Sequence, residues 1–246
     1  MSVEIVDRPP RALLPCPARP VDKRCNSLEE AVAGIADGST ILISGFGECG
    51  TPNALITALI EQGAKELTII TNNAGSGEEG VAALLRAGRV RRVICSYPRS
   101  RDSVWFERRY AEGTIELELV PQGTLTERIR AAGAGIPAFY TPTGVGTLLG
   151  DEKESRIIDG RTYVLEYALG ADVALLRAEK ADARGNLTYH AAARNFAPTM
   201  AAAAVLSIVE VAQIIGVEGS LDPEEVVTPG IYVDRIVQAV DEAAFA

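Results

Sequence analysis

The stretch TILISGFGECGTPNALITALIEQG, residues 40–63, decides the fold, because it contains a strand, a loop and a helix in succession. Residues 40–44 form an apolar, β-branched run that is typical of a buried strand. Gly45, Gly47 and Gly50 follow this run. Glycine has no Cβ, so the backbone N–H groups of such a loop can approach a ligand closely. We therefore expect the loop to be a binding element.

The helix after the loop is predicted from its boundary residues and its apolar stripe. Thr51 is suited to the N-cap, Pro52 to the first helical position, and Gly63 to the end of the helix. The stripe is made of Leu55, Ile56, Leu59 and Ile60. A strand, a glycine loop and a helix N-terminus in this order form a natural seat for an anion or an oxyanion, and we place the function there.

Strands and helices alternate in the residues that follow. Apolar runs at 67–71, 90–96 and 115–120 predict strands, and helical patterns follow them at 81–88, 103–112 and 124–133. Ser27 with Glu30, and Thr124 with Glu127, predict capping boxes at helix starts. This alternation predicts an α/β fold with a mostly parallel sheet flanked by helices, in which ligands bind at the carboxyl ends of the strands.

The pattern changes after residue 133. Residues 135–150, GIPAFYTPTGVGTLLG, are rich in Gly, Pro and Thr and are interpreted as an ordered loop system. Residues 161–169 and 173–178 are predicted to be adjacent strands. Residues 1–26 carry five prolines and predict an N-terminal arm, whereas residues 27–246 are predicted to form one α/β domain.

Composition and charge narrow the classes of partner. The 246-residue chain has a formal net charge of −9, which argues against nucleic acid and against an anionic membrane surface. No apolar run reaches the ~18 residues of a membrane span, and the N-terminus lacks the hydrophobic core of a signal peptide. Cys16, Cys25, Cys49 and Cys95 form no CxxC pair, so we expect reduced thiols, a cytoplasmic location and no metal site.

A dinucleotide site is one alternative for the glycine loop, because GFGECG satisfies the pattern G-x-G-x-x-G after a strand. In that pattern the helix starts inside the motif, whereas Thr51 and Pro52 place the predicted helix start after the third glycine. The pattern also requires an acid at the end of the second strand, where this chain has Thr71, Asn72 and Asn73. A purely structural turn is the other alternative.

Longer segments of the chain carry a resemblance to a known family. Asp37-Gly38, the TILI run, Ser44-Gly45-Phe46 and Gly50-x-Pro52 resemble the signature of the A subunits of family I CoA-transferases, which normally have Gly-Gly-Phe in place of Ser44-Gly45-Phe46. The resemblance covers residues 27–246 and implies the mostly parallel, helix-flanked NagB/RpiA-like fold of that family. Its further segments are NNAGSGEEG, GRVRRVICSYPR, ELELVPQGTLTERIRAAGAGIPAFYTPTGVGTLL, KADARGNLTY, ARNFAP and VVTPGIYVDRIV.

The resemblance implies an enzyme that is built from two kinds of chain. In that family CoA moves from succinyl-CoA to a 3-oxo acid, in ping-pong order, through a glutamyl-CoA intermediate on the B subunit. This chain would then hold no catalytic residue of its own and no tightly bound cofactor, with CoA acting as a co-substrate. We expect a heterodimer with the B subunit, doubled to an A2B2 tetramer.

Two loops indicate the substrate. The NNAG-x-G loop and the run Cys95-Ser96-Tyr97-Pro98-Arg99 most resemble members that act on 3-oxoadipate, in the β-ketoadipate pathway of aromatic compound degradation. Acetoacetate-directed members share most of the other segments and give the alternative substrate. Because 3-oxoadipate carries two carboxylates, a positive group is expected for the distal one, and Arg99 is our candidate, with Arg101 second.

The binding candidates lie in loops that follow strands. For contact with CoA or the reacting acyl oxygen they are Ser44, Gly45, Phe46, Gly47, Glu48, Cys49 and Gly50, whose backbone N–H groups would act as fixed dipoles. For the substrate they are Asn72, Asn73, Gly75, Arg99 and Gln122, with Thr143 as a secondary candidate. The alternatives are turn-forming asparagines, a solvated surface arginine and a core role for Phe46.

Glu48, Cys49 and His190 are the residues that could serve as a nucleophile or base within this chain. We interpret Glu48 as a solvated loop acid and Cys49 as a small side chain packed beneath the helix start. His190 is the only histidine, and nothing near it in the sequence completes a triad, so we interpret it as a structural or surface residue.

Overall fold

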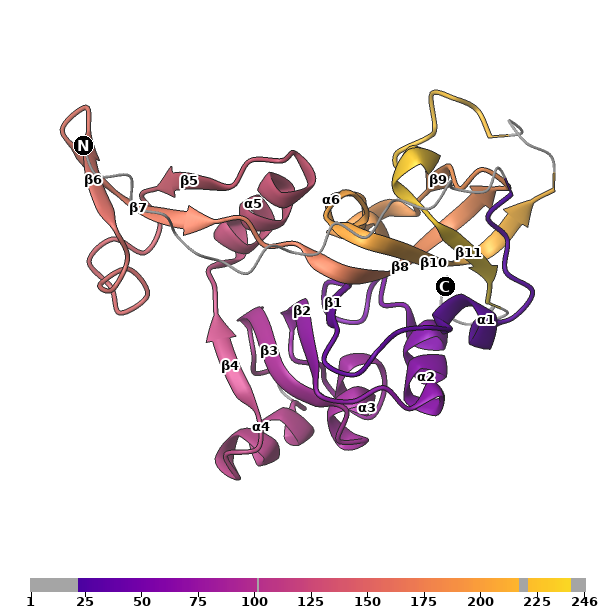
Figure 1. Ribbon diagram of the computed structural model, residues 1–246, viewed down its shortest axis with the longest axis horizontal. Coiled ribbons are helices and arrows are strands. Elements are labelled where there is room, and N and C mark those ends of the chain that lie inside the picture. Colours follow the sequence, from indigo (N-terminus) through magenta and orange to yellow (C-terminus); the bar gives the residue numbers. More distant parts are fainter. Residues whose placement is uncertain (1–21, 101, 217–220, 240–246) are drawn as a thin grey trace.

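The computed structural model describes residues 22–100, 102–216 and 221–239. Its main sheet has eight strands in the order β11-β10-β8-β1-β2-β3-β4, with β9 beside β8 (Figure 1). Every neighbouring pair along this order is parallel, and only β9 runs antiparallel to its neighbour. The predicted α/β fold with a mostly parallel sheet is therefore confirmed.

The first half of the chain builds one side of this sheet from successive strand–helix units. A crossover helix between parallel strands is what such a sheet requires. The elements are α1 Leu28–Val32, β1 Thr40–Ile43, α2 Asn53–Gln62, β2 Leu67–Asn73, α3 Gly80–Arg86, β3 Val90–Tyr97, α4 Val104–Ala111, β4 Glu116–Leu119 and α5 Gln122–Gly133.

The second half adds the other side of the sheet, so that β8 lies between β1 and β10. This order brings residues of the C-terminal half directly beside the glycine loop that follows β1. The elements are β8 Ala171–Asp182, β9 Leu187–Thr188, the 3-10 turn η1 Ala191–Arg194, α6 Ala197–Ala202, β10 Ala204–Ile215, the 3-10 turn η2 Gly230–Tyr232 and β11 Arg235–Gln238.

Helices cover both faces of the sheet (Figure 1). Ile41 and Ile43 of β1 pack into the core cluster with α1–α4, whereas Leu42 between them packs into the cluster with α5 and α6. Successive side chains of a strand point to opposite faces. A strand that is buried on both faces therefore reads as a continuous apolar run, as residues 40–43 do.

The predicted helix ends are partly right. α2 ends at Gly63, whose φ is +100°, and the Ser27 hydroxyl accepts the Glu30 N–H at 3.2 Å as predicted. Thr51 as N-cap is wrong, because α2 begins at Asn53 with Pro52 at its N-cap and no side-chain capping bond. A capping box at Thr124 is also wrong, since α5 begins at Gln122 and Thr124 is buried within it.

A separate antiparallel sheet of three strands projects from the main body, at the left of Figure 1. It is formed by β5 Ala138–Thr141, β6 Ser155–Ile158 and β7 Arg161–Tyr167, in the order β5-β7-β6. The prediction that residues 161–169 and 173–178 are adjacent strands is wrong. β7 pairs within this small sheet and β8 within the main one, and an alternating pattern does not specify the partner of a strand.

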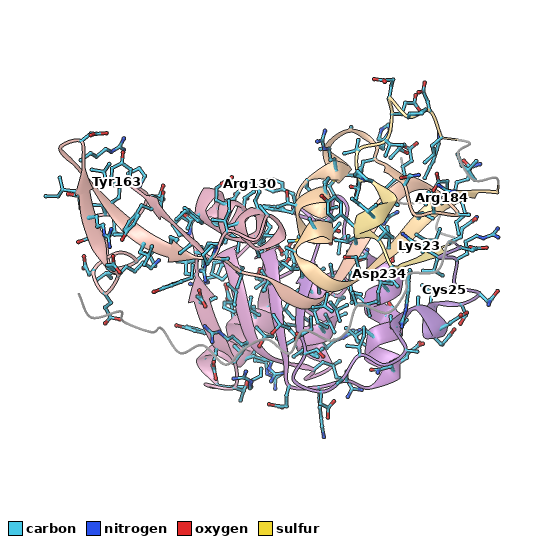
Figure 2. All side chains as sticks on the ribbon, turned by 45° about the horizontal axis from the view of Figure 1, so that its top comes forward. Lys23, Cys25, Arg130, Tyr163, Arg184 and Asp234 are labelled. Atoms are coloured by element: carbon cyan, nitrogen blue, oxygen red, sulfur yellow. The ribbon has the colours of Figure 1, made fainter. Side chains whose placement is uncertain are left out.

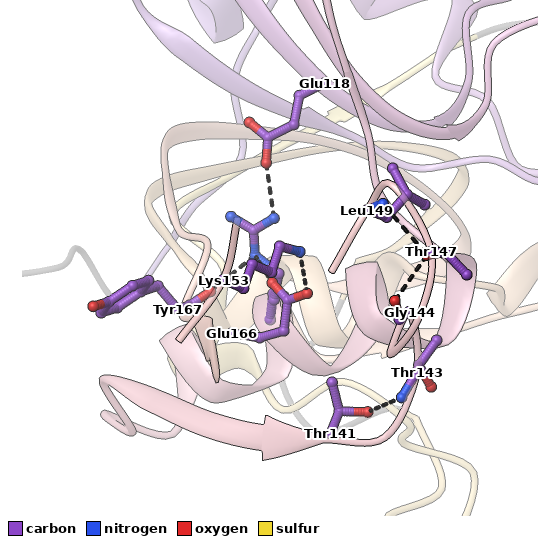
Figure 3. A network of polar contacts seen from close by, with 10 residues as sticks. Glu118, Thr141, Thr143, Gly144, Thr147, Leu149, Lys153, Glu166 and Tyr167 are labelled. Carbon is purple, nitrogen blue, oxygen red and sulfur yellow. Dashed lines mark hydrogen bonds and ion pairs between the residues drawn. The ribbon is translucent and has the colours of Figure 1, made fainter. Parts of the chain in front are cut away.

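Arg128 of α5 joins the small sheet to the main body through its contacts with Glu118 and Tyr167, which Figure 3 labels. Its Nη1 donates to Glu118 of β4 at 2.8 Å, and its Nε donates to the carbonyl of Tyr167 in β7 at 2.9 Å. Glu166, which is buried, lies 3.9 Å from the Arg128 Nε and pairs with Lys153 at 2.5 Å. This polar junction fixes β7 against β4 and α5.

The interpretation of residues 135–150 as an ordered loop system is wrong for residues 138–141, because they form β5. The loop between β5 and β6 is held by its own side chains (Figure 3). The Thr141 hydroxyl accepts the Thr143 N–H at 3.2 Å. The Thr147 hydroxyl donates to the Gly144 carbonyl at 2.8 Å and accepts the Leu149 N–H at 3.3 Å. These short-range contacts are what threonine and glycine supply in turns.

The first described residues already belong to the folded body. The carbonyl of Lys23 accepts the Ile236 N–H at 2.8 Å, and the N–H of Cys25 donates to the Ile236 carbonyl at 2.8 Å, beside β11 (Figure 2). The predicted N-terminal arm falls mostly on residues 1–21, which lie outside the described part of the chain. None of the helices in that part has the length and apolarity needed to span a membrane.

Candidate active-site edge

The loops after β1, β2 and β3 meet at the carboxyl edge of the sheet, as the parallel topology predicts. Glu48 of the glycine loop accepts a hydrogen bond from the Ser76 hydroxyl at 2.9 Å. Ser103, at the start of α4, donates to the carbonyl of Gly75 at 2.8 Å. The three loops that carry most of the predicted binding residues are therefore in mutual contact.

Within the glycine loop, residues 46–49 form a tight turn, which we call the 46–49 turn. The N–H of Phe46 donates to the Cys49 carbonyl at 3.0 Å, and the N–H of Cys49 donates back to the Phe46 carbonyl at 3.3 Å. Gly47 has a φ of +62°, a value that two-residue turns between antiparallel segments favour. The four residues of the turn are exposed, and the Gly47 and Glu48 N–H groups donate to no acceptor among the described residues.

The three glycines serve different purposes. A Cβ on Gly45 would lie 2.5 Å from the Thr51 hydroxyl, and one on Gly50 would lie 2.4 Å from the Asn195 Nδ2 and 2.5 Å from the Ala193 carbonyl oxygen. A Cβ on Gly47 would have nothing within 4 Å. Gly45 and Gly50 therefore allow close packing within the protein, and only Gly47 faces open space.

The N-terminus of α2 already holds an anion that belongs to the chain. The Glu210 carboxylate of β10 accepts the Leu55 N–H at 2.9 Å, and Glu210 is only 3% exposed. The neighbouring Arg177 of β8 has its Nη1 4.0 Å from the same carboxylate and 3.5 Å from the Thr51 carbonyl. The expected helix-terminal seat is thus filled by Glu210, which leaves the 46–49 turn as the part of the loop that is open to a ligand.

A small recess lies between the glycine loop and the loop after β2. Its volume is about 10 Å³, enough for one water-sized group. Residues of both loops line it, so candidates for CoA binding and candidates for substrate binding converge there. The recess is lined by Ser44, Gly45, Gly47, Glu48, Thr51, Thr71, Asn73, Gly75 and Val81.

The two asparagines after β2 have different environments. Asn72 is 5% exposed, and its Nδ2 donates to the Ser96 hydroxyl at 3.0 Å, which ties β2 to β3. The Asn73 side chain accepts the Gly75 N–H at 2.8 Å and so forms a local turn beside the recess. Gly75 has a φ of +81°, and a Cβ there would lie 2.4 Å from the Ala82 nitrogen. Asn73 and Gly75 line the recess, and Asn72 lies behind it.

Arg99 and Gln122 lie at the carboxyl edge but do not line the recess. Arg99 is exposed and forms an ion pair with Glu107 at 2.8 Å, a hydrogen bond that raises the pKa of Arg99. Gln122 is the exposed first residue of α5 and lies three positions after the last residue of β4. Thr143 lies in the loop of the small sheet, and Arg101 lies outside the described residues.

The candidates for a nucleophile or base do not form a set. Glu48 is exposed and contacts Ser76. Cys49 is exposed in the 46–49 turn, so the expectation that it packs beneath the helix is wrong. Cys95 is fully buried, and burial raises its pKa to about 12. His190 is exposed. No group of His, Cys, Asp or Glu in the described ranges is arranged to hold a metal ion.

Asn195 was not predicted, although it lies in the ARNFAP segment. Its side chain accepts the Gly45 N–H at 3.0 Å and donates to the Cys49 carbonyl at 3.1 Å. An asparagine next to a short apolar helix is a common loop residue, and only the tertiary structure places it against a loop 150 positions away. The same is true of Glu210.

Comparison with known proteins gives the family context of this geometry. The profile of the Coenzyme A transferase family matches residues 25–239. The A subunit of 3-oxoadipate CoA-transferase from Pseudomonas putida is 57% identical over 224 residues, which cover 91% of this chain and 96% of that protein. The A subunit of the succinyl-CoA:3-ketoacid coenzyme A transferase from Xanthomonas campestris pv. campestris strain B100 is 51% identical, covering 87% of this chain and 88% of that protein.

Solved structures share the fold. An acyl-CoA transferase from Escherichia coli O157:H7, in a thioester complex with CoA, matches with a TM-score of 0.79 and 24% identity, over 92% of this chain and 50% of its own. This chain thus spans about half the length of that enzyme. A variant of the decarboxylase AibA/AibB matches with a TM-score of 0.76 and 29% identity, over 89% of this chain and 83% of its own.

Proposed function

The chain belongs to the Coenzyme A transferase family, and we propose that it is the A subunit of a cytoplasmic enzyme that moves CoA from succinyl-CoA to 3-oxoadipate. The observation that supports this substrate most strongly is the identity to relatives named as A subunits of 3-oxoadipate CoA-transferase, 57% in Pseudomonas putida and 51% in Acinetobacter baylyi. Acetoacetate is the second candidate, because a relative named for 3-ketoacids is also 51% identical.

The 46–49 turn is the proposed receiver of the acyl thioester. Its Gly47 and Glu48 residues are exposed, and their N–H groups donate to no acceptor among the described residues. Donors that are already oriented stabilise negative charge as it develops on a carbonyl oxygen, because they need no rearrangement during the reaction. The role of this chain would be to bind and polarise the thioester carbonyl.

The nucleophile is proposed to come from the B subunit. Attack of its glutamate on the thioester carbonyl would release CoA thiolate and form an acyl–glutamyl anhydride. Attack of that thiolate on the glutamyl carbonyl would then release succinate and leave glutamyl-CoA. The carboxylate of the 3-oxo acid would reverse these steps and leave with CoA. No residue of this chain changes its covalent state in the sequence of steps.

The carboxyl edge has the character expected of a surface that a partner chain covers. Phe46 is 53% exposed, and Tyr97 at the end of β3 and Val104 at the start of α4 are each 64% exposed. A partner chain that covers this edge would remove these apolar side chains from water. A partner that docks here could bring its carboxylate to the 46–49 turn, and an A2B2 assembly is the proposed form.

The test is co-expression with the adjacent reading frame, followed by an assay of CoA transfer from succinyl-CoA. We expect transfer to 3-oxoadipate by the mixed chains and none by this chain alone. Faster turnover of acetoacetate than of 3-oxoadipate would favour the second candidate. A base-labile adduct of labelled CoA on this chain would contradict the division of labour between the two chains, and binding of NADH instead of CoA esters would favour a dinucleotide site.

A further inference from the structure

We propose that Asn195 is a positioning residue, which holds the 46–49 turn in the shape that receives the acyl thioester. This inference rests on the proposed function and adds a residue to it. Asn195 follows η1, in the connection between β9 and α6, and lies against both ends of the turn. No substrate contact is assigned to it, so it would act through the turn.

The amide of Asn195 uses all of its hydrogen-bonding capacity. Its Oδ1 accepts the N–H of Gly45 at 3.0 Å and that of Phe196 at 2.6 Å. Its Nδ2 donates to the carbonyl oxygens of Cys49 at 3.1 Å and Ala193 at 2.9 Å. A side-chain amide offers two acceptor and two donor positions. Rotating the amide by 180° would break every one of these bonds, so the network itself fixes the orientation.

These bonds join the turn to the connection between β9 and α6. One amide contacts Gly45, directly before the turn, and Cys49, its last residue. Gly50, the next residue, packs so tightly against Ala193 and Asn195 that a Cβ would not fit. The connection after β9 thus defines the position of the turn relative to β8 and β10.

The backbone of Asn195 also indicates a special role. Its φ is +25° and its ψ is −119°, outside the regions that non-glycine residues ordinarily adopt. Such a conformation persists only where the surrounding contacts hold it, and it is found most often at functional sites. Here the four bonds of the side chain hold it, and they would fix the turn whose Gly47 and Glu48 N–H groups have no acceptor among the described residues.

The variant that isolates this role is Asn195→Asp, because it keeps the shape and both acceptor positions. It replaces the donors to Cys49 and Ala193 with a carboxylate oxygen, which would face two carbonyl oxygens. Asn195→Ala removes the group without adding charge and serves as the second variant if the first does not fold. Gln213→Glu, an exposed change on β10, is the matched control for the added charge.

Two measurements are made on each variant in the complex with the B subunit. Hydrogen exchange of residues 44–51 reports whether the turn is held, and exchange of labelled succinate into succinyl-CoA reports the first half-reaction. We expect faster hydrogen exchange in this segment and a kcat that falls by about 10- to 100-fold, since a misplacement of ~1 Å has effects of that size. The KM for succinyl-CoA should change less than about threefold, because the variant disturbs the reacting end of the thioester and leaves the rest of its binding surface intact. The control should match the wild type.

The outcomes separate this inference from the proposed function. A variant in which residues 44–51 exchange hydrogen faster, but whose kcat stays close to that of the wild type, would overturn the positioning role. Unchanged protection of residues 44–51 would show that Asn195 does not hold the turn, and would overturn it too. If the wild-type complex does not exchange CoA, the proposed function is refuted, and with it the catalytic role of the 46–49 turn. Hydrogen exchange would still decide whether Asn195 holds the turn.

Discussion

The carboxylate of Glu210 accepts a hydrogen bond from the backbone N–H of Leu55 at 2.9 Å, so a strand of the C-terminal half supplies the anion at the N-terminus of α2. Helix N-termini attract negative charge, because their first N–H groups have no partner within the helix. In this protein the charge is internal and buried. We therefore expect a ligand to contact the 46–49 turn, which precedes α2, and not the N-terminus of the helix itself.

Replacement of Glu210 by Ala should destabilise the fold by about 3 kcal/mol, because it removes the acceptor of the Leu55 N–H and the carboxylate beside Arg177. Glu210→Gln keeps an acceptor oxygen and should be less damaging. Urea unfolding measures both. Glu61→Ala, an exposed change on α2, is the control and should stay within ~0.5 kcal/mol of the wild type. Equal stability of Glu210→Ala and the control would refute the structural role.

Gly50→Ala should be much more damaging than Gly47→Ala, although both residues have positive φ values of +76° and +62°. The left-handed conformation costs any alanine roughly 1–2 kcal/mol. At Gly50 the new Cβ would also overlap Ala193 and Asn195, for a further cost of roughly 1–3 kcal/mol. Thermal or urea unfolding compares the two, and similar losses would contradict the packing argument.

Local sequence patterns were sufficient to predict part of the fold. The continuous apolar run of β1 indicated a buried strand, and Gly63 indicated the end of α2, and the structure confirms both. The carboxyl-edge rule for parallel sheets then placed the loops after β1, β2 and β3 side by side without any knowledge of their contacts.

The parts that could not be predicted depend on contacts between distant residues. Asn195 and Glu210 contact the glycine loop region across 150 and 155 positions, and no local motif distinguishes them from ordinary loop and strand residues. Thr51 looked like an N-cap by residue type, yet its hydroxyl donates to the Gly47 carbonyl at 3.4 Å and the N-terminus of α2 uses Glu210 instead. Tertiary contacts decided these details.

Arg99→Ala should raise the KM for 3-oxoadipate about tenfold and leave that for acetoacetate unchanged, because only the former has a distal carboxylate to pair with. The ion pair of Arg99 with Glu107 is exposed, so the change should not alter the unfolding midpoint. Arg108→Ala, which breaks the similar exposed pair between Arg108 of α4 and Glu112 at the end of that helix, is the control. An equal effect on both acids, or none, would remove Arg99 from the substrate site.

Glu118 should make the stability of the protein depend on pH on the acid side. Burial acts to raise the pKa of its carboxyl, but hydrogen bonds and charges from Arg128 and Arg92 outweigh burial and hold the pKa below its ordinary value. A carboxyl whose pKa is lower in the folded state contributes stability above its unfolded pKa, about 4.3, and loses it as the pH falls through the folded pKa.

The variant Glu118→Gln tests this sign, because it keeps the size of the side chain and removes its titration. At pH 7 the variant should be less stable by about 2 kcal/mol, since it loses charge-assisted bonds to Arg128 and Arg92. The two proteins should converge as the pH falls from about 4.3 through the lower folded pKa of Glu118, because the wild-type carboxyl becomes protonated over that range. Urea unfolding across this range measures the difference, with the exposed Glu152→Gln at the same junction as control. A difference that stays constant down to the acid limit would mean that the charge of Glu118 does not stabilise the junction between β4, α5 and β7.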